Sequence, residues 1–374
     1  MAVFKIFPEK DATIYSEYSN MNTGRDEILE IASYYKGSDR YVNRSVIAFD
    51  TAEVNSVINT YISSSNRAAT DFSASLRLML ASANEVPTAY RLEAFPVYAS
   101  TPGTWTAGNG KYGDSPRNSS GVSWDFIDST GSYSWATVNN VTASYTGSSI
   151  GGGTWYTGSG NYDFTYMTQS HTVVSTHDAN INITEGIKAH YNGEITNAGF
   201  LVKLQDSLEF QTDRQLYLRY FSNNSHTIYP PHLELKWDDF ETDSTLSEVS
   251  DPNIVMKIKN NRGKYTDVGR QRFNLHVRPK YPTRTFTTSS VYLTNYYLPT
   301  ASYWGLRDEN TEEMVIDFDT TFTKISRNTT GNYFDIYMEG LEPERYYRVL
   351  IKSEIDGSTN VIDENLVFKV VRNG

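Results

Sequence analysis

The chain has 374 residues, of which 39% are hydrophobic and 21% charged, so it has enough apolar side chains to bury cores and is not a disordered protein. The net charge of −11, without a run of Lys or Arg, argues against nucleic-acid binding, and no apolar stretch approaches the roughly 18 residues of a membrane span. Because there is no cysteine, disulfide bonds, thiol nucleophiles and cysteine-based zinc sites are excluded.

The abundant side chains are those that suit β-strands and the turns between them. Aromatic residues make up 14% of the chain, with 28 Tyr, 17 Phe and 6 Trp, and many Thr, Ser, Asn and Val residues accompany them. Long helical runs of Ala, Leu, Glu and Lys are missing. The composition therefore predicts an all-β protein, and at roughly 150 residues per domain the length predicts two domains.

The first predicted domain spans residues 1–237. Short apolar or alternating segments predict its strands, which are 3–7, 12–15, 28–31, 45–49, 76–80, 91–98, 199–204, 216–221 and 233–237. One short helix is predicted over 184–191, with Thr184 as its N-cap.

Residues 100–170 are too long for an ordinary loop and are rich in Gly, Ser, Thr and Asn. The large aromatic residues of this segment have two interpretations. They either hold the segment against the body of the domain, or they stack on sugar rings as a glycan-binding surface. The candidate glycan-binding residues are Trp105, Trp124, Trp135, Trp155 and Tyr156.

Residues 238–251 are acidic and carry almost no strand pattern, so we predict a linker there. The oxygen ligands of Asp238, Asp239, Glu241 and Asp243 make a calcium site the alternative, although their spacing does not match an EF-hand loop. No other cofactor is expected.

The second predicted domain spans residues 252–374 and carries seven short strand patterns, a number and spacing typical of a Greek-key β-sandwich. These patterns cover 254–258, 272–277, 291–293, 314–318, 333–338, 347–351 and 366–371.

Residues 1–237 resemble the DNRLRE family of jelly-roll-type β-sandwich domains in six short motifs that follow the family's order. The motifs are Asp11-Ala12-Thr13-Ile14, Asn22-Thr23-Gly24 with the strand 27–31, Arg44-Ser45-Val46-Ile47-Ala48-Phe49-Asp50, Asn182-Ile183-Thr184 with Ile187, Asn197-Ala198-Gly199-Phe200-Leu201-Val202, and Phe221-Ser222 with Pro231-His232-Leu233. The region between about 100 and 175 departs from the pattern and is expanded. The resemblance implies a non-catalytic module, of a kind found on large extracellular proteins, sometimes glycan-binding, and in virion proteins of tailed phages.

The segment 340–347, Gly-Leu-Glu-Pro-Glu-Arg-Tyr-Tyr, resembles the tyrosine corner of immunoglobulin and fibronectin-like domains. The resemblance implies that residues 252–374 form a smaller immunoglobulin-like β-sandwich. It also implies that the Tyr347 hydroxyl bonds back to the main chain a few residues upstream.

No catalytic motif is present in the sequence. The six histidines, including His171 and His177, lack a tight metal-binding spacing, and there is no nucleophile elbow, phosphate loop or dinucleotide fingerprint. We therefore predict a non-enzymatic protein; a glycosidase carboxylate pair that only the fold brings together is the enzymatic alternative.

The first residues of the chain show no basic region followed by an apolar run and a cleavage site, so no secretory signal is predicted. Surface-type sandwich domains, the lack of cysteine and the lack of a signal together favour a tailed-phage virion protein of the neck, tail, baseplate or an attached appendage. Such a protein is made in the host cytoplasm and assembles symmetrically with other virion proteins, with a host glycan as a further candidate partner, and neither binds nucleic acid nor inserts in a membrane. The alternative is a carbohydrate-binding module of a bacterial surface or secreted protein whose signal has been removed.

The stretch 291–305 is unusually aromatic for a surface loop. It carries the candidate docking residues Tyr292, Tyr296, Tyr297, Tyr303 and Trp304. The alternative is that these rings fill the core of the second domain.

Overall fold

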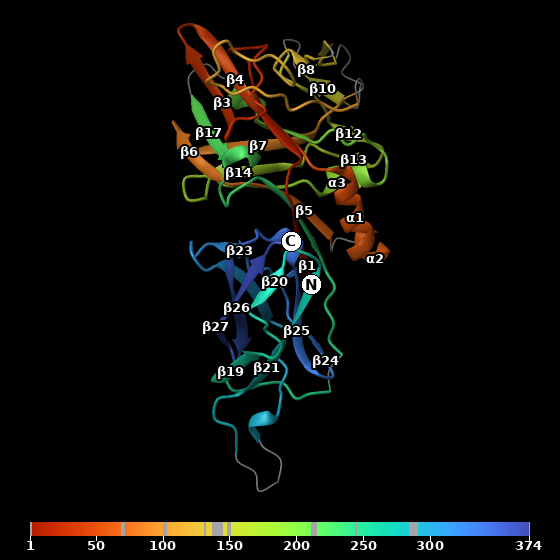
Figure 1. Ribbon diagram of the computed structural model, residues 1–374, viewed down its shortest axis with the longest axis vertical. Coiled ribbons are helices and arrows are strands. Elements are labelled where there is room, and N and C mark those ends of the chain that lie inside the picture. The colour runs from red at the N-terminus through yellow and green to blue at the C-terminus, as the bar shows by residue number, and fades with distance from the viewer. Residues whose placement is uncertain are drawn as a thin grey trace. The chain divides into compact units, whose positions relative to one another are not determined.

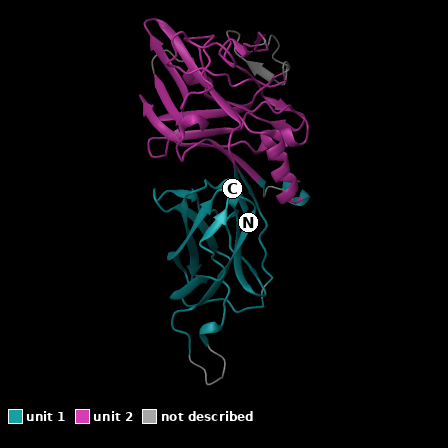
Figure 2. Cartoon of the chain, viewed as in Figure 1, with its two compact units in different colours: residues 1–5, 64–72, 235–374 teal, residues 6–63, 73–234 magenta. Residues whose placement is uncertain are grey.

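The computed structural model describes residues 2–68, 72–99, 103–130, 132–136, 145–147, 151–210, 215–243, 245–283 and 291–373 (Figure 1). The chain divides into two compact units (Figure 2). Unit 1 comprises residues 1–5, 64–72 and 235–374, and unit 2 comprises residues 6–63 and 73–234. Strands dominate both units, so the predicted all-β class is confirmed.

The first eighteen strands in chain order form unit 2 and its borders. They are β1 (Ala2–Ile6), β2 (Lys10–Tyr15), β3 (Ile28–Lys36), β4 (Asp39–Ala48), β5 (Phe72–Leu78), β6 (Leu80–Asn84), β7 (Ala89–Pro96), β8 (Phe126–Asp128), β9 (Tyr133–Ser134), β10 (Tyr145–Gly147), β11 (Thr154–Tyr156), β12 (Gly158–Ser159), β13 (Tyr162–Asp163), β14 (Thr168–Thr172), β15 (Ala179–Asn182), β16 (Phe200–Leu204), β17 (Leu216–Phe221) and β18 (His232–Trp237). The helices of this part of the chain are α1 (Thr51–Tyr61), α2 (Ser64–Ala68), α3 (Thr184–Tyr191), α4 (Asp206–Glu209) and the 3-10 helix η1 (Asn223–Ser225).

The main sheet of unit 2 has eight strands, in the order β14-β7-β16-β4-β3-β17-β6 with β2 paired to β4. A four-stranded sheet has the order β1-β18-β5-β15. Alternation along the strands builds the core: in β17, Leu216, Leu218 and Tyr220 are buried while the residues between them are partly exposed. The expanded region contributes the small antiparallel pairs β8–β9, β10–β11 and β12–β13.

The predicted helix over 184–191 is confirmed as α3, but Thr184 is not its N-cap. The cap is Ile183, and Thr184 is the first helical residue. The Thr184 hydroxyl instead accepts a hydrogen bond from the Ala74 backbone N–H and donates one to Asn182 Oδ1, because a strand edge lies beside it and satisfies its hydrogen bonds.

Unit 1 is a β-sandwich. Its strands are β19 (Ile254–Ile258), β20 (Lys264–Thr266), β21 (Arg270–Pro279), β22 (Ser302–Asp308), β23 (Met314–Ile316), β24 (Ser326–Asn328), β25 (Gly331–Tyr337), β26 (Tyr346–Ile355) and β27 (Ser358–Val371), with the 3-10 helices η2 (Val291–Leu293) and η3 (Met338–Gly340). One sheet has the order β19-β21-β25-β24 and the other β20-β27-β26-β22-β23, and only β20–β27 is parallel among the strand pairs described in unit 1. This strand order is that of an immunoglobulin-like sandwich, as predicted.

Four strand assignments in unit 1 differ from the prediction. Residues 291–293 form the 3-10 helix η2 and not a strand, and the strands β20, β22 and β24 were not predicted. The segment 238–251, predicted as a linker, packs against unit 1. The Glu241 carbonyl accepts a 2.9 Å hydrogen bond from the Arg327 backbone N–H, and Val249 is buried in the core of that unit.

The tyrosine corner is confirmed. Tyr347 lies at the start of β26, is 2% exposed, and its hydroxyl donates a 2.9 Å hydrogen bond to the carbonyl oxygen of Glu342. This bond fixes the turn that leads into the strand.

Replacing Tyr347 by phenylalanine is expected to lower the free energy of unfolding of unit 1 by about 0.5–1.5 kcal/mol, because the ring stays and one hydrogen bond is lost. Urea denaturation followed by fluorescence measures this loss. The transition of unit 2 should be unchanged, and an unaltered stability of unit 1 would show that the bond does not stabilise the turn.

Candidate functional site

The four candidate tryptophans are buried and do not form a sugar-stacking surface. Their exposed fractions are 1% for Trp105, 3% for Trp124, 5% for Trp135 and 7% for Trp155. Two of the indole N–H groups donate to main-chain carbonyls, Trp105 to Ala198 at 2.8 Å and Trp135 to Ser123 at 3.0 Å. Of the two interpretations of these tryptophans, the geometry therefore supports the structural one: the rings hold the expanded region against the sheet.

Trp124 and Trp155 enclose a buried guanidinium. The Cζ atom of Arg44 lies 5.2 Å from the Trp124 ring centroid and 5.3 Å from that of Trp155. Arg44 Nη1 also donates to the carbonyl of Gly152 at 2.6 Å. Gly152 has φ +85°, and a Cβ there would lie 2.5 Å from the Trp124 ring, so this position requires glycine.

Arg44 is paired with a fully buried carboxylate. Its Nε and Nη2 atoms donate to the two oxygens of Glu209 at 3.0 and 2.6 Å, and the side chains are 2% and 0% exposed. Lys203, 1% exposed, lies 3.6 Å from Glu209, 3.4 Å from Glu93 and 2.6 Å from Asp206. We call Arg44, Lys203, Glu93 and Glu209 the buried charge cluster.

The side chains of the buried charge cluster pair with one another inside unit 2, an arrangement that stabilises the fold and does not offer a catalytic group to a substrate. Each charge in it has an opposite charge within 4 Å, and the two tryptophans cover the guanidinium. Because no face of Arg44 or Glu209 is exposed, neither side chain is placed to contact a substrate. The Arg44-Ser45-Val46 motif of the family resemblance therefore supplies an interior ion pair.

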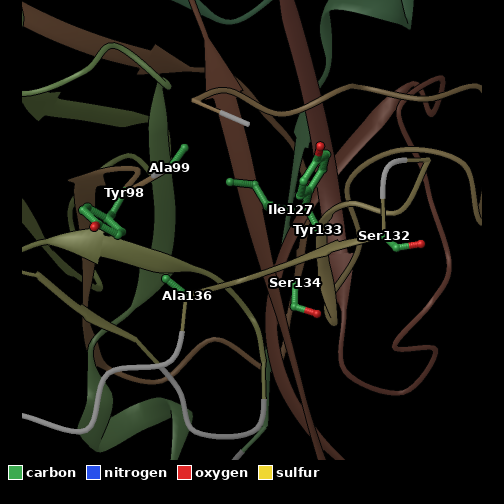
Figure 3. Close-up of a pocket in the computed structure, with 7 residues that line it drawn as sticks. All are labelled: Tyr98, Ala99, Ile127, Ser132, Tyr133, Ser134 and Ala136. Carbon is green, nitrogen blue, oxygen red and sulfur yellow. The ribbon is translucent and has the colours of Figure 1, made fainter. Parts of the chain in front are cut away.

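The fifth candidate, Tyr156, is partly exposed, and it contacts Tyr98, a residue that lines a pocket (Figure 3). Its ring packs edge-on against Tyr98, with centroids 5.1 Å apart. The pocket has a volume of about 200 Å³ and is lined by Tyr98, Ala99, Ile127, Ser132, Tyr133, Ser134 and Ala136. No acidic, basic or histidine side chain is among these seven residues, so the walls supply hydroxyl groups and apolar surface but no general acid or base other than tyrosine.

The candidate docking residues divide into core and surface. Trp304 is 0% exposed and stacks on Phe334 with ring centroids 5.2 Å apart, so it belongs to the core, which corrects its assignment as a docking residue. Tyr296 packs against the same core. Tyr297 and Tyr303 are partly exposed and Tyr292 is 49% exposed, so Tyr292 is the most accessible of the five.

The histidines that the sequence singled out are brought together in unit 2. The Tyr90 ring stacks on His171 at 4.6 Å, and its hydroxyl lies 2.8 Å from His177 Nδ1. Burial lowers the pKa of His171. In the part of the chain that the structure describes, no group of three or more His, Asp or Glu side chains is placed to hold a metal ion.

Comparison with protein-family models and with curated protein sequences gives no match to this chain. No helix within the described ranges is long and apolar enough to cross a membrane.

Proposed function

We propose that this chain is a non-enzymatic structural protein of a tailed-phage virion, located at the neck, tail, baseplate or an appendage attached there, and that it serves assembly and host-surface attachment. The observation that carries the proposal is the residue pattern of 1–237, which resembles a module found in virion proteins and lies in a chain whose units are both all-β. The acidic charge of −11 is consistent with subunits that stay soluble and repel one another until a specific docking surface binds them.

Unit 1 offers an exposed surface for such docking. Tyr281, Tyr292 and Leu293 are 76%, 49% and 78% exposed. The Arg278 guanidinium lies 5.1 Å from the Tyr292 ring centroid, and the Lys280 ammonium 5.7 Å from that of Tyr281. Aromatic rings beside arginine are typical of the residues that dominate binding energy at protein interfaces.

The experiment is density-gradient centrifugation of particles from lysed cells that produce the full chain. We expect the chain to sediment with assembled particles and to remain after repeated gradients. We expect the double variant Tyr292→Ser, Leu293→Ser to fold normally and to be incorporated less. A chain that stays in the soluble fraction while particles form would contradict the proposal, whereas normal incorporation of the double variant would contradict only this docking surface.

A further inference from the structure

Charge is unevenly distributed along unit 1. Residues 252–283 hold eight Lys and Arg residues and one carboxylate, Asp267, although the chain as a whole has a net charge of −11. Residues 308–323 hold six Asp and Glu residues and no Lys or Arg. Because charges of both signs are normally interspersed on the surface of a soluble domain, two segments of opposite sign need an explanation.

The basic segment follows one edge of the sandwich. β19 is an edge strand of one sheet and β20 is an edge strand of the other. Only residues 259–263 separate the two strands, so these edges lie on the same side of the sandwich. Lys257, Lys259, Arg262 and Lys264 are exposed there. We call these four residues the basic edge.

The cations of the basic edge are not neutralised within the chain. Elsewhere in unit 1, Arg272 pairs with Asp335 at 2.9 Å and Arg345 pairs with Asp308 at 2.6 Å. In the part of the chain that the structure describes, no carboxylate lies within 4 Å of the charged groups of the basic edge. The basic edge therefore presents unpaired positive charge to a partner.

The acidic segment lies at the opposite edge of the same sheet. β23 and β20 are the two outermost strands of the five-stranded sheet. Glu312 and Glu313, in the turn before β23, and Asp317, just after it, are exposed. Within the described ranges Glu312 and Glu313 form no ion pair, whereas Glu309 pairs with Arg348. We call Glu312, Glu313 and Asp317 the acidic edge.

Cations near β23 leave the acidic edge unneutralised. The Lys5 ammonium donates to the Val315 carbonyl at 2.6 Å and is almost fully buried, and Lys236 pairs with Asp319 at 3.7 Å. The charge of the acidic edge is thus also available to a partner.

The strand register places the two edges at the same level of the sheet. Lys264 of β20 lies opposite Lys369 of β27, and Lys369 lies opposite Tyr346 of β26. The Tyr346 carbonyl accepts a 2.9 Å hydrogen bond from the Glu309 N–H, at the end of β22 and three residues before Glu312. A second copy displaced sideways by the width of this sheet would therefore bring its Lys264 beside Glu312 and Glu313 of the first.

Charge complementarity selects a second copy of this chain as the partner. A nucleic acid would also be attracted to the basic edge, but it would leave the acidic edge unused and would be repelled by the net charge of −11. A second copy uses both edges. It also covers apolar surface, because Val268 is 52% exposed just after β20, and Met314 and Val315 of β23 are partly exposed.

We propose that copies of this chain associate head to tail through unit 1, with the basic edge of one copy against the acidic edge of the next. Because the two edges lie on opposite sides of one sheet, a two-fold dimer cannot pair both of them. Each copy therefore has two neighbours, an arrangement that gives a ring or a filament. This inference goes beyond the virion proposal and does not depend on it.

The first test is sedimentation velocity of the full chain at two salt concentrations. At about 0.1 M salt the Debye length is about 10 Å, so the long-range repulsion between acidic chains is screened while charges in contact still attract; at about 1 M it is about 3 Å. With the chain at about 0.1 mM, we expect an average mass above that of the 42.4 kDa monomer in the lower salt and a fall toward the monomer in the higher. A monomer at both, or association that strengthens with salt, would overturn the inference.

The second test exchanges the charges of the edges. One variant is Arg262→Glu with Lys264→Glu, and the other is Glu312→Lys with Glu313→Lys. Each variant alone should associate at least about tenfold more weakly than the wild type, because like charges then meet. An equimolar mixture of the two should associate again, because every contact then joins opposite charges. Restored association also excludes misfolding as the cause of the losses.

Glu354→Lys with Asp356→Lys is the matched control. It changes the net charge as much as the acidic-edge variant does, but these exposed residues lie at the turn between β26 and β27, the central strands of the sheet. This variant should associate as the wild type does, since neither edge is altered.

A mixture that stays monomeric, or a control variant that dissociates like the edge variants, would overturn the inference. So would a gel-shift experiment in which the chain binds single-stranded nucleic acid while it remains monomeric. Head-to-tail association of a chain that is absent from particles would leave this inference intact and reject the virion proposal, so the two failures are distinguishable.

Discussion

Replacing Glu209 by alanine is expected to lower the free energy of unfolding of unit 2 by about 3–5 kcal/mol. The substitution leaves the guanidinium of Arg44, 2% exposed, without its carboxylate, and removes one of the partners of the buried Lys203. An uncompensated buried charge is among the largest single costs in a folded protein. Urea denaturation should report the loss through Trp124 and Trp155, whose rings lie against Arg44.

Asp206→Ala is the matched control, since Asp206 also pairs with Lys203 but its side chain is 77% exposed. It should cost less than about 1 kcal/mol, because the Asp206 carboxylate is hydrated and Lys203 keeps Glu93 and Glu209 as partners. The double variant Arg44→Met, Glu209→Leu should be less destabilised than Glu209→Ala, because it removes both charges of the pair. Equal losses for Glu209→Ala and Asp206→Ala would contradict the role assigned to the buried charge cluster.

Replacing Trp304 by alanine is expected to lower the free energy of unfolding of unit 1 by about 3–5 kcal/mol, because it opens a large cavity. The ring is fully buried between the sheets and stacks on Phe334. In the strand pairing of β22 with β26, Trp304 lies opposite Ile351. Thermal and urea denaturation measure the effect.

Two variants serve as controls for this cavity. Trp304→Phe should cost less, because it keeps a ring and removes an indole N–H that has no hydrogen-bond partner within the described residues. Tyr292→Ala, at a 49% exposed position, should change stability by no more than about 0.5 kcal/mol. If Trp304→Ala folded as stably as Tyr292→Ala, the residue would not be part of the core.

The strand pattern and the tyrosine corner could be predicted from the sequence because each depends on local order. Alternation in 216–221 and 347–351 reports a half-buried sheet, and the Leu-x-Pro spacing before Tyr347 encodes a turn that closes on itself. The helix α1 was missed although a local signal exists: Asp50 caps it by accepting from the Glu53 N–H, and Val54, Val57 and Ile58 follow at helical spacing.

The sites could not be predicted in the same way because they depend on long-range pairing. Whether an aromatic ring lies inside or outside is decided by the strand that packs on it, and Trp304 lies in a strand, β22, that the sequence did not reveal. Tyr34, Tyr41 and Tyr217 contact one another across the main sheet of unit 2. The pair Tyr34 and Tyr41 could be predicted, because a two-residue turn at Gly37-Ser38 places them opposite each other. Tyr217 joins them only through the pairing of β17 with β3, which no spacing in the sequence encodes.

The measurement that tests the proposed function most directly is electron cryo-microscopy of particles purified from lysed cells that produce the full chain. Our account predicts density for an immunoglobulin-like sandwich and a larger β-rich unit, repeated in the symmetry of the neck, tail or baseplate. Particles of complete structure without this density, together with the chain recovered only as a free protein, would contradict it.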